Sequence, residues 1–400
     1  MAQRADNIAA GPLTGVRVLD FCSFIAGSFG AMMLGDMGAD VVKVEPLTGD
    51  PSRTWGPFIG GESKLFQGWN RSKRSLALDL KDSAGQEVAA DLVRGADVVM
   101  VNFRPGVAER LGIGYDQLCE INPSIIYLSS TAFGDTGPYR LRPGYDPVLQ
   151  SMSGAARVHE RMCQTVHICS VAVSDYQAAT LATGGVCAAL FHRERTGEGQ
   201  KIETSLLQAV MSVQSSSFIQ ALEQEEDAVG GIYPYKMFAA ADAPVFVACG
   251  TNRFWQLLCD ELGRPELASD DRYDTNPKRV CAAAELEGVL APLFAERSSG
   301  EWEAKLLERG VPCAAARTSA EFFDDPQVAA LEMSQVIEHS SIGPLRVMGL
   351  PMNFRSTPGA IQRAAPVLGE HSREVLEEVG LDGDRIDGLI AAGVVGVAGS

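Results

Sequence analysis

Basic side chains gather early in a chain that is acidic overall. The sequence holds 34 Lys and Arg against 51 Asp and Glu, which gives a formal net charge of −17 at pH 7. Guanidinium groups bind phosphate through paired hydrogen bonds, so the early basic side chains can form a groove for a phosphorylated ligand. Scattered, solvated helix ends are the alternative interpretation. The early basic residues are Arg71, Lys73, Arg74, Lys81, Arg104, Arg110, Arg140 and Arg142.

Two acids stand where the chain is expected to turn. In the turn at residues 142–146, Tyr145 lies beside Asp146. Asp175 ends an apolar stretch, residues 171–175, that is typical of a strand, and it directly precedes an Ala-rich segment, residues 176–194, long enough for a buried helix. A carboxylate at that junction accepts hydrogen bonds from the free N–H groups of the first helical turn. From its neighbours alone, Asp175 is therefore predicted to be a helix N-cap.

Several motifs that would indicate other chemistry are missing. Gly27 and Gly30 follow a predicted strand, but the first glycine of the dinucleotide fingerprint is absent, and close helix–sheet packing explains the two that remain. The sequence contains no G-x-S-x-G elbow, no P-loop and no pair of His at metal-binding spacing. Its nine Cys form no C-x-x-C pair, which favours reduced, mostly buried thiols. We expect no metal site and no permanently bound cofactor.

Length and composition exclude further classes. A chain of 400 residues predicts about two or three domains, and 46% hydrophobic with 21% charged residues is typical of a globular protein. The negative charge disfavours nucleic acid and anionic lipid as partners. No signal peptide is expected from the first residues, and the longest apolar stretches, 21–34 and 389–397, fall short of the roughly 20 residues of a membrane helix. The sequence predicts a cytoplasmic protein with no membrane or nucleic-acid partner.

The first 135 residues alternate between strand-like and helix-like segments. Strands are predicted at residues 16–21, 41–45, 98–102 and 125–129, and helices at 26–37 and 86–94. This alternation predicts a parallel sheet with helical crossovers, and ligands of such sheets bind beyond the carboxyl ends of the strands. The polar residues expected at those ends are Ser23, Glu45, Asn102 and Ser130.

The later segments predict a second, smaller unit and then a loop-rich C-terminal stretch. After the helix at 176–194 come a short strand, 201–205, and an amphipathic helix, 206–222. The acidic run at 223–227 is interpreted as a linker. A strand at 245–249 and helices at 252–262 and 282–290 then predict a small α/β unit. From about residue 324 the chain is loop-rich, with one terminal helix at 372–379.

Seven motifs in this order resemble the class III CoA-transferases, the CaiB/BaiF family, over nearly the whole chain. They are GPLTGVRVLD (11–20), GADVVKVE (38–45), NRSKRS (70–75), NFRPG (102–106), RPGYD (142–146), TGEGQ (196–200) and APVLGEH (365–371). Within that family the chain is most similar to dicarboxylate transferases of the succinyl-CoA:glutarate type. TWGP (54–57), GES (61–63), Tyr273, Asn276 and Arg279 carry this narrower resemblance.

The resemblance implies an α/β fold of two domains. A large, doubly wound, Rossmann-like domain is expected from residues 1–222 together with the C-terminal segment 326–400. A small α/β domain with its linkers is expected at 223–325. The family fold also implies an interlocked homodimer, in which two subunits thread through each other.

The resemblance also implies a catalytic site. Asp175 matches the family's catalytic aspartate, with Tyr145 and Asp146 beside it. An ordinary Asp, with a pKa of about 3.9, is ionised at pH 7 and needs no general base. Asp175 would take CoA from an acyl-CoA as an aspartyl-CoA thioester and pass it to a free acid. Phe24, Ala26, Leu78, Asn102 and Arg110 match CoA contacts, and Lys73, Arg74, Arg104 and Arg142 are expected to bind CoA from the basic cluster.

Other activities remain open at this point. The same family fold hosts 2-methylacyl-CoA racemases, which need a His in a Gly-His-Asp tripeptide. This chain has Gly144, Tyr145 and Asp146 there, and Tyr is a poor base at neutral pH. His159 or His167 could supply a base by another geometry. Intramolecular CoA transfer within one branched dicarboxylate, and a non-catalytic CoA-binding role, are the remaining alternatives.

The expected substrates are a donor such as succinyl-CoA and a C4–C5 dicarboxylate acceptor. A dicarboxylate needs a cation for the carboxylate that does not react. Arg53, Arg71, Arg157 and Arg161 are the candidates, and the sequence does not choose among them.

Overall fold

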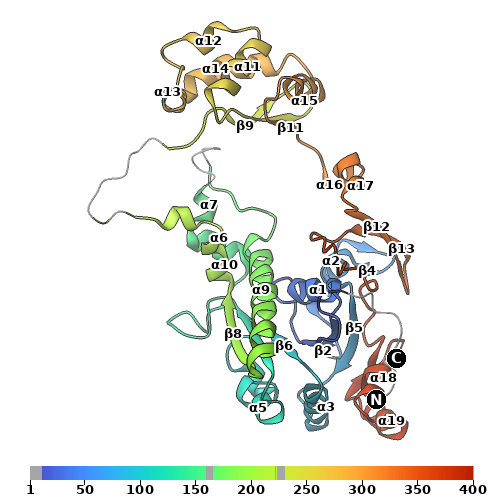
Figure 1. Ribbon diagram of the computed structural model, residues 1–400. Helices are drawn as coiled ribbons and strands as arrows, with labels where there is room; N and C mark the ends of the chain where they lie inside the picture. The colour runs from blue at the N-terminus through green and yellow to red at the C-terminus, as the bar shows by residue number, and fades with distance from the viewer. Residues whose placement is uncertain (1–10, 159–164, 221, 223–229, 400) are drawn as a thin grey trace. The chain divides into compact units, whose positions relative to one another are not determined.

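The computed structural model describes residues 11–158, 165–220, 222 and 230–399 (Figure 1). The chain divides into two compact units, one from the described residues of Met1–Phe218 with Ala329–Ser400 and one from those of Ile219–Val328. The acidic run predicted as a linker lies outside the described residues. In the described part of the chain, no helix is long and apolar enough to cross a membrane.

The first unit is built on a seven-stranded sheet in the order β14-β5-β2-β1-β6-β7-β8. Six strands are parallel and β14 joins one edge antiparallel to β5. The parallel strands, counted along the chain, follow the order 3-2-1-4-5-6 of dinucleotide-binding folds. The strands are β1 (Arg17–Asp20), β2 (Asp40–Glu45), β5 (Lys73–Leu78), β6 (Val98–Val101), β7 (Ile126–Thr131), β8 (Gln200–Ser205) and β14 (Val395–Gly396).

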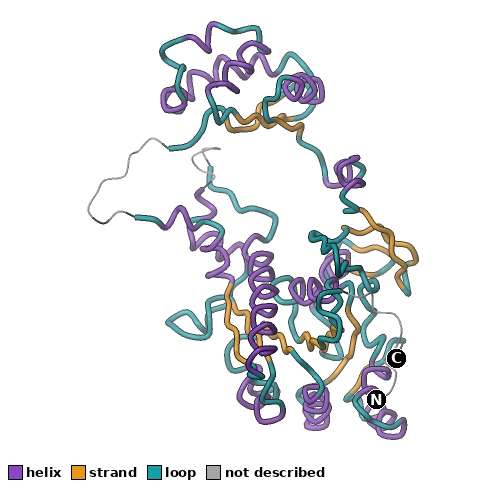
Figure 2. Tube along the Cα trace, in the orientation of Figure 1, coloured by secondary structure: helices purple, strands orange, loops and turns teal. Residues whose placement is uncertain are grey.

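Helices cover both faces of this sheet, as the apolar strands require (Figure 2). On one face, α3 (Ser83–Arg94), α5 (Tyr115–Ile121), α18 (Ser372–Glu378) and α19 (Gly383–Ala391) pack on one hydrophobic core. On the other, α1 (Ser28–Asp36) and α9 (Val173–Thr196) pack on a second core. Small residues let α1 approach α9: a Cβ built at Gly30 would lie 3.0 Å from the Ala179 carbonyl oxygen.

Short elements complete the first unit at the carboxyl ends of the strands and beyond. They are η1 (Pro51–Thr54), β3 (Phe58–Ile59), β4 (Glu62–Ser63), α2 (Lys64–Asn70), α4 (Val107–Arg110), α6 (Asp146–Ser153), α7 (Ala155–Val158), α10 (Leu206–Ser212), η2 (Ser215–Phe218), β12 (Ser334–His339) and β13 (Gly343–Met348). The last two form an antiparallel hairpin.

The predicted mixed α/β fold with a parallel sheet is confirmed, while some local predictions are wrong. The C-terminal stretch holds the hairpin of β12 and β13 and the helix α19 in addition to the expected helix at 372–379. The expected helix at 206–222 is interrupted, because α10 ends at Ser212 and a 3₁₀ turn follows. The expected strand at 171–175 does not form, because α9 already begins at Val173. β-branched residues favoured the strand there, but tertiary contacts at the helix start decide the outcome.

The second unit is a three-stranded antiparallel sheet covered by helices. Its strands are β9 (Tyr235–Ala239), β10 (Pro244–Ala248) and β11 (Cys313–Ala315), in the order β11-β10-β9. Phe238 and Phe294 stack in its core with ring centroids 4.3 Å apart. Its helices are α11 (Asn252–Glu261), α12 (Glu266–Ser269), α13 (Asn276–Cys281), α14 (Ala283–Phe294), α15 (Ser299–Glu308) and α16 (Ser319–Phe323); α17 (Pro326–Ala330) spans the boundary.

Candidate active site

A cavity of about 260 Å³ opens in the first unit beyond the carboxyl ends of β1, β6 and β7. The parallel order reverses between β1 and β6, and in such sheets this is the point where ligands bind. The cavity is lined by Phe24, Ile25, Ala26, Trp55, Trp69, Asn102, Phe103, Arg104, Pro105, Ser130, Thr131, Ala132, Arg140, Arg142, Gly144, Tyr145, Asp175 and Leu206. The structure therefore brings together Asp175, Tyr145 and most of the residues expected from the loops after β1 and β6.

The loop after β1 forms an aromatic wall of the cavity. Phe24 adopts a φ of +60°, a left-handed conformation that is rare for a bulky residue and tends to occur at functional sites. Its ring lies 4.9 Å from the Trp55 ring and 6.2 Å from the Tyr145 ring, measured between centroids.

Asn102 fixes this loop from the end of β6. Its Oδ1 accepts a hydrogen bond from the Ser23 N–H at 2.9 Å, and its Nδ2 donates to the Ser23 carbonyl oxygen at 2.6 Å. Asn102 was expected to contact CoA. The structure places it in the cavity wall with both ends of its amide engaged by the loop.

Asp146, rather than Asp175, holds the start of α9. Asp146 is buried at the first position of α6. Its Oδ1 accepts hydrogen bonds from the Ser174 N–H at 2.8 Å and the Ser174 hydroxyl at 2.5 Å, and its Oδ2 accepts from Gln150 Nε2 at 2.6 Å. The N-cap of α9 is Ala172, which makes no side-chain cap. The prediction that Asp175 is a helix N-cap is therefore wrong, because the carboxylate that accepts a backbone N–H of the first turn, that of Ser174, comes from another helix.

Asp175 is left with a carboxylate that faces the cavity. Among the described residues no donor forms a hydrogen bond with it. Burial raises the pKa of Asp175 to about 7, and the nearby negative charge of Asp146 adds to this effect. The positive end of α9 favours the ionised form and works in the opposite direction. The expectation of full ionisation at pH 7 is thus revised: near pH 7 the protonated and ionised forms coexist, and the ionised form is poorly solvated.

Two further side chains shape the cavity around Asp175. Tyr145 is 59% exposed and directly precedes Asp146, so its ring stands at the cavity beside the helix start. Trp69, which is buried and also lines the cavity, donates a hydrogen bond from Nε1 to the Tyr176 hydroxyl at 3.0 Å. That bond ties the residue after Asp175 to α2.

Three guanidinium groups give the cavity a positive wall. Arg104, Arg140 and Arg142 line it, and within the described ranges none of them forms an ion pair with a carboxylate. The Arg142 guanidinium lies 5.2 Å from the Tyr139 ring and 5.9 Å from the Phe133 ring. Arg140 was not among the residues expected to bind CoA, although its place two residues before Arg142 in the basic cluster was a usable signal. These groups suit an anionic ligand.

Other residues expected to bind CoA lie elsewhere. Lys73 is fully buried, with Nζ 2.7 Å from Asp20 Oδ2, and the Arg74 guanidinium pairs with Asp40, Glu374 and Glu378. Leu78 is buried and pairs with Val395 in the sheet. These positions do not support direct CoA contacts. Arg110 donates to the Gly106 carbonyl oxygen at 2.9 Å and is not among the lining residues of the cavity.

The arginines considered for the acyl carboxylate are mostly engaged. Arg53 donates to both oxygens of Glu45, at 2.8 and 2.7 Å, and stacks on Phe66. Arg71 pairs with Asp36 at 2.7 Å and also donates to the carbonyl oxygens of Met348, the last residue of β13, and Gly349. Arg157 lies in α7, and Arg161 is outside the described residues.

No histidine among the described residues lines this cavity. His167 is exposed and contacts the Thr165 hydroxyl, and His159 lies outside the described residues. Tyr145, which precedes Asp146 in the chain, lines the cavity instead. Within the described ranges, no group of three His, Cys, Asp or Glu side chains could hold a metal ion.

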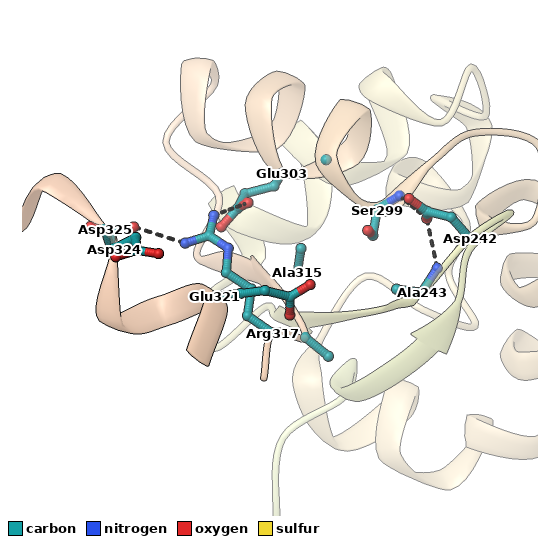
Figure 3. Close-up of a pocket in the computed structure, with 11 residues that line it drawn as sticks. Asp242, Ala243, Ser299, Glu303, Ala315, Arg317, Glu321, Asp324 and Asp325 are labelled. Atoms are coloured by element: carbon teal, nitrogen blue, oxygen red, sulfur yellow. Dashed lines mark hydrogen bonds and ion pairs between the residues drawn. The ribbon is translucent and has the colours of Figure 1, made fainter. Parts of the chain in front are cut away.

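A second cavity, of about 470 Å³, lies within the small unit, and its lining includes five acidic residues and one arginine (Figure 3). Arg317 points between Glu303 and Asp325 and pairs with them at 2.8 and 2.9 Å. Asp242 accepts hydrogen bonds from the Ser299 and Ala243 N–H groups, both at 2.7 Å. With its cation neutralised, this cavity is poorly suited to an anionic ligand.

Comparison with known proteins identifies the family. The model of CoA-transferase family III matches residues 13–372. The chain is 35% identical to human succinyl-CoA:glutarate CoA-transferase, with 96% of this chain and 90% of that protein covered. It is 35% identical to the acetyl-CoA:oxalate CoA-transferase of Acetobacter aceti, with coverage of 81% and 85%. A solved CaiB/BaiF family protein from Brucella suis matches with a TM-score of 0.81 and 33% identity, covering 92% of this chain and 100% of that one. The chain belongs to CoA-transferase family III and is a CoA-transferase.

Proposed function

We propose that this enzyme moves CoA from an acyl-CoA, succinyl-CoA being the expected donor, to a C4–C5 dicarboxylic acid through a covalent aspartyl-CoA on Asp175. The observation that carries the proposal is the Asp175 carboxylate: it faces the cavity, accepts no hydrogen bond from the described residues and stands in the first turn of α9. A buried carboxylate with few partners is a better nucleophile than a solvated one once it is ionised.

The first half-reaction proceeds in two steps. A carboxylate oxygen of Asp175 attacks the thioester carbon of the donor, and the C–S bond breaks to release CoA thiolate and leave a mixed anhydride. The thiolate then attacks the Asp175 carboxyl carbon, which frees the donor acid and forms the aspartyl-CoA thioester. N–H groups of the first α9 turn can stabilise the oxyanions that develop.

The second half-reaction is the first in reverse with a different acid. The acceptor carboxylate attacks the aspartyl-CoA carbon and expels CoA thiolate, and the thiolate attacks the acceptor's acyl carbon. Asp175 leaves as a free carboxylate and a new acyl-CoA is released. One thioester replaces another, so the reaction needs no ATP.

The remaining cavity residues have binding roles in this proposal. Arg104, Arg140 and Arg142 bind anionic groups of the CoA ester or of the acid. Phe24, Ala26 and Tyr145 form the wall against the thioester end, and Asp146 positions α9. At about 260 Å³ the cavity is below the usual range of about 300–1,000 Å³ for ligand pockets. It therefore suits a short acyl group with the thiol end of CoA.

The substrate assignment rests on similar proteins. The human relative is named for succinyl-CoA and glutarate, and the Acetobacter aceti relative for acetyl-CoA and oxalate. Both acceptors are dicarboxylates, and the positive wall of this cavity suits an acid that keeps one carboxylate while the other reacts.

We also propose that the enzyme works as an interlocked homodimer, with a large domain from residues 1–222 and 326–400 and a small domain from 223–325. Large apolar side chains stand exposed on α9 and the segment after it, which favours burial against another subunit. They include Leu181, Phe191, Met211, Val213 and Phe218.

The test of this function is a substrate panel. The protein is incubated with succinyl-CoA and individual free acids, and the CoA esters are identified by mass spectrometry. A new dicarboxylyl-CoA with release of succinate supports the proposal, and its identity names the acceptor. Absence of any new ester across the panel would contradict it. Deuterium uptake at the α-carbon of a branched acyl-CoA in D₂O would indicate the racemase reaction instead.

A further inference from the structure

Four charged side chains are buried beneath the loop that follows β1. Asp20, Lys43 and Lys73 are fully buried, and Asp50 is 1% exposed. Lys73 Nζ lies 2.7 Å from Asp20 Oδ2, and Lys43 Nζ lies 3.0 Å from Asp50 Oδ2. Each charge thus has an opposite partner. Removing ion pairs from water is costly, and a buried pair is weak evidence for stability, so this cluster calls for another role.

The Lys43–Asp50 pair holds the backbone of the cavity loop on both sides of Ser23. Lys43 Nζ donates a hydrogen bond to the Cys22 carbonyl oxygen at 2.8 Å. Asp50 Oδ1 accepts from the Ser52 N–H at 2.8 Å and faces the Phe24 N–H at 3.5 Å. Neither Lys43 nor Asp50 lines the cavity itself, so any effect on a ligand must pass through the loop.

The loop held by this ion pair contains Phe24, the residue with the strained backbone. Phe24 keeps its positive φ only while its surroundings fix the conformation, and its ring is the cavity surface that meets Trp55 and Tyr145. If the Cys22–Phe24 backbone relaxes, the ring leaves this position and the wall of the cavity that Asp175 also lines changes shape.

We propose that Lys43 and Asp50 are positioning residues for CoA transfer: their ion pair holds the Cys22–Phe24 backbone and thereby keeps the Phe24 ring in the cavity wall. The proposal rests on the transfer function proposed above. It assigns the buried charges a role in the geometry of the bound thioester.

The test compares Asp50→Asn with Asp36→Asn. Asp36 is a matched control, because it is also buried and ion-paired, at 2.7 Å from Arg71, but lies away from the cavity loop. The kcat and KM for succinyl-CoA and the Kd of free CoA by calorimetry are measured well below both unfolding midpoints. We expect Asp50→Asn to lower kcat/KM by about 10- to 100-fold, as for a displaced binding wall, and to weaken CoA binding. Asp36→Asn should stay within about twofold.

Equal losses in both variants, or an unchanged Asp50→Asn enzyme, would overturn the proposal. If Asp50→Asn does not fold, the double variant Lys43→Met with Asp50→Asn replaces it, because Asp20 and Lys73 still pair and no buried charge is left alone. A folded double variant with kcat/KM reduced tenfold or more supports the positioning role. A double variant with wild-type kcat/KM, or one that cannot fold, refutes it. If the wild type transfers no CoA, the proposed function fails, while the calorimetric comparison still tests the positioning role.

Discussion

Asp146 accepts two hydrogen bonds from Ser174, one from the backbone N–H at 2.8 Å and one from the hydroxyl at 2.5 Å, and Ser174 immediately precedes Asp175. One carboxylate thus fixes the helix turn that carries the other. The same contact brings two negative groups close together, and the charge of Asp146 adds to burial in raising the pKa of Asp175 to about 7. Asp146 therefore both fixes the position of Asp175 and contributes to its raised pKa.

The transfer rate should depend on pH through the ionisation of Asp175. Below its pKa the carboxyl is protonated and cannot attack, so kcat/KM should rise about tenfold per pH unit up to roughly pH 7 and then level off. The kcat/KM profile between pH 5 and 9 measures this. The Kd of free CoA is measured over the same range, because the CoA 3′-phosphate itself titrates at about pH 6 and its effect on binding must be separated from the ionisation of Asp175. A profile that is already flat at pH 5 would contradict the raised pKa.

Asp146→Asn should move that profile. The amide keeps an oxygen to accept the Ser174 N–H but loses the negative charge, so the pKa of Asp175 should fall and the rise in kcat/KM should shift to lower pH. Glu120→Gln is the control, because Glu120 is exposed and the substitution changes the net charge equally. An unshifted profile in Asp146→Asn would mean that burial alone sets the pKa.

Ionisation of Asp175 should lower the stability of the fold, although it raises the activity. The folded-state pKa lies above the ordinary value of 3.8, so the folded protein binds the proton more tightly than the unfolded chain does. Ionisation therefore destabilises the fold as pH rises from about 4 through 7. Asp175→Asn should match the wild type in Tm near pH 4 and exceed it at pH 8. Parallel Tm curves for the two proteins would contradict this.

Ser130 offers a separate test of the cavity wall. Its Oγ is buried without a hydrogen-bond partner in the described structure, and such a group costs about 1–3 kcal/mol. Ser130→Ala should therefore raise the free energy of unfolding by about 1 kcal/mol, measured by denaturant titration. Ser129→Ala, on the opposite face of β7, is the comparison. A clear loss of stability in Ser130→Ala would show that the hydroxyl has a partner in solution.

Arg140 should contribute to binding of the CoA ester. Loss of a charge-assisted hydrogen bond is worth about 1.5–3 kcal/mol, so Arg140→Ala should raise KM for the acyl-CoA about tenfold or more with a smaller change in kcat. Arg94→Ala is the control, since Arg94 is exposed and pairs with Asp91 in α3. If both variants keep the wild-type KM, Arg140 does not bind the ester.

The local sequence pattern of strands and helices predicted those parts of the site whose position depends on residues close in the chain. The alternation of strands and helices placed Asn102, Ser130 and the loop after β1 at one edge of the sheet, and the structure brings them to one cavity. Asp175 and Tyr145 were singled out as residues at chain turns, but their roles came only from resemblance to a family.

What the sequence could not show depends on contacts between distant segments. Arg74 was expected to bind phosphate, but its partners Glu374 and Glu378 lie about 300 residues later in the chain. Lys73 was expected to bind CoA, but it is fully buried and paired with Asp20. The pKa of Asp175 likewise depends on Asp146, which only the packing of α6 against α9 brings near.

The central claim is that Asp175 carries CoA covalently. The protein is incubated with succinyl-CoA without an acceptor, quenched, digested and analysed by mass spectrometry, with Asp175→Ala treated in parallel. We predict a CoA thioester on the peptide that contains Asp175, its disappearance when a dicarboxylate acceptor is added, and none in Asp175→Ala, which should also lose transfer activity. Full transfer activity in Asp175→Ala, or turnover by the wild type with no adduct on that peptide, would contradict the covalent mechanism.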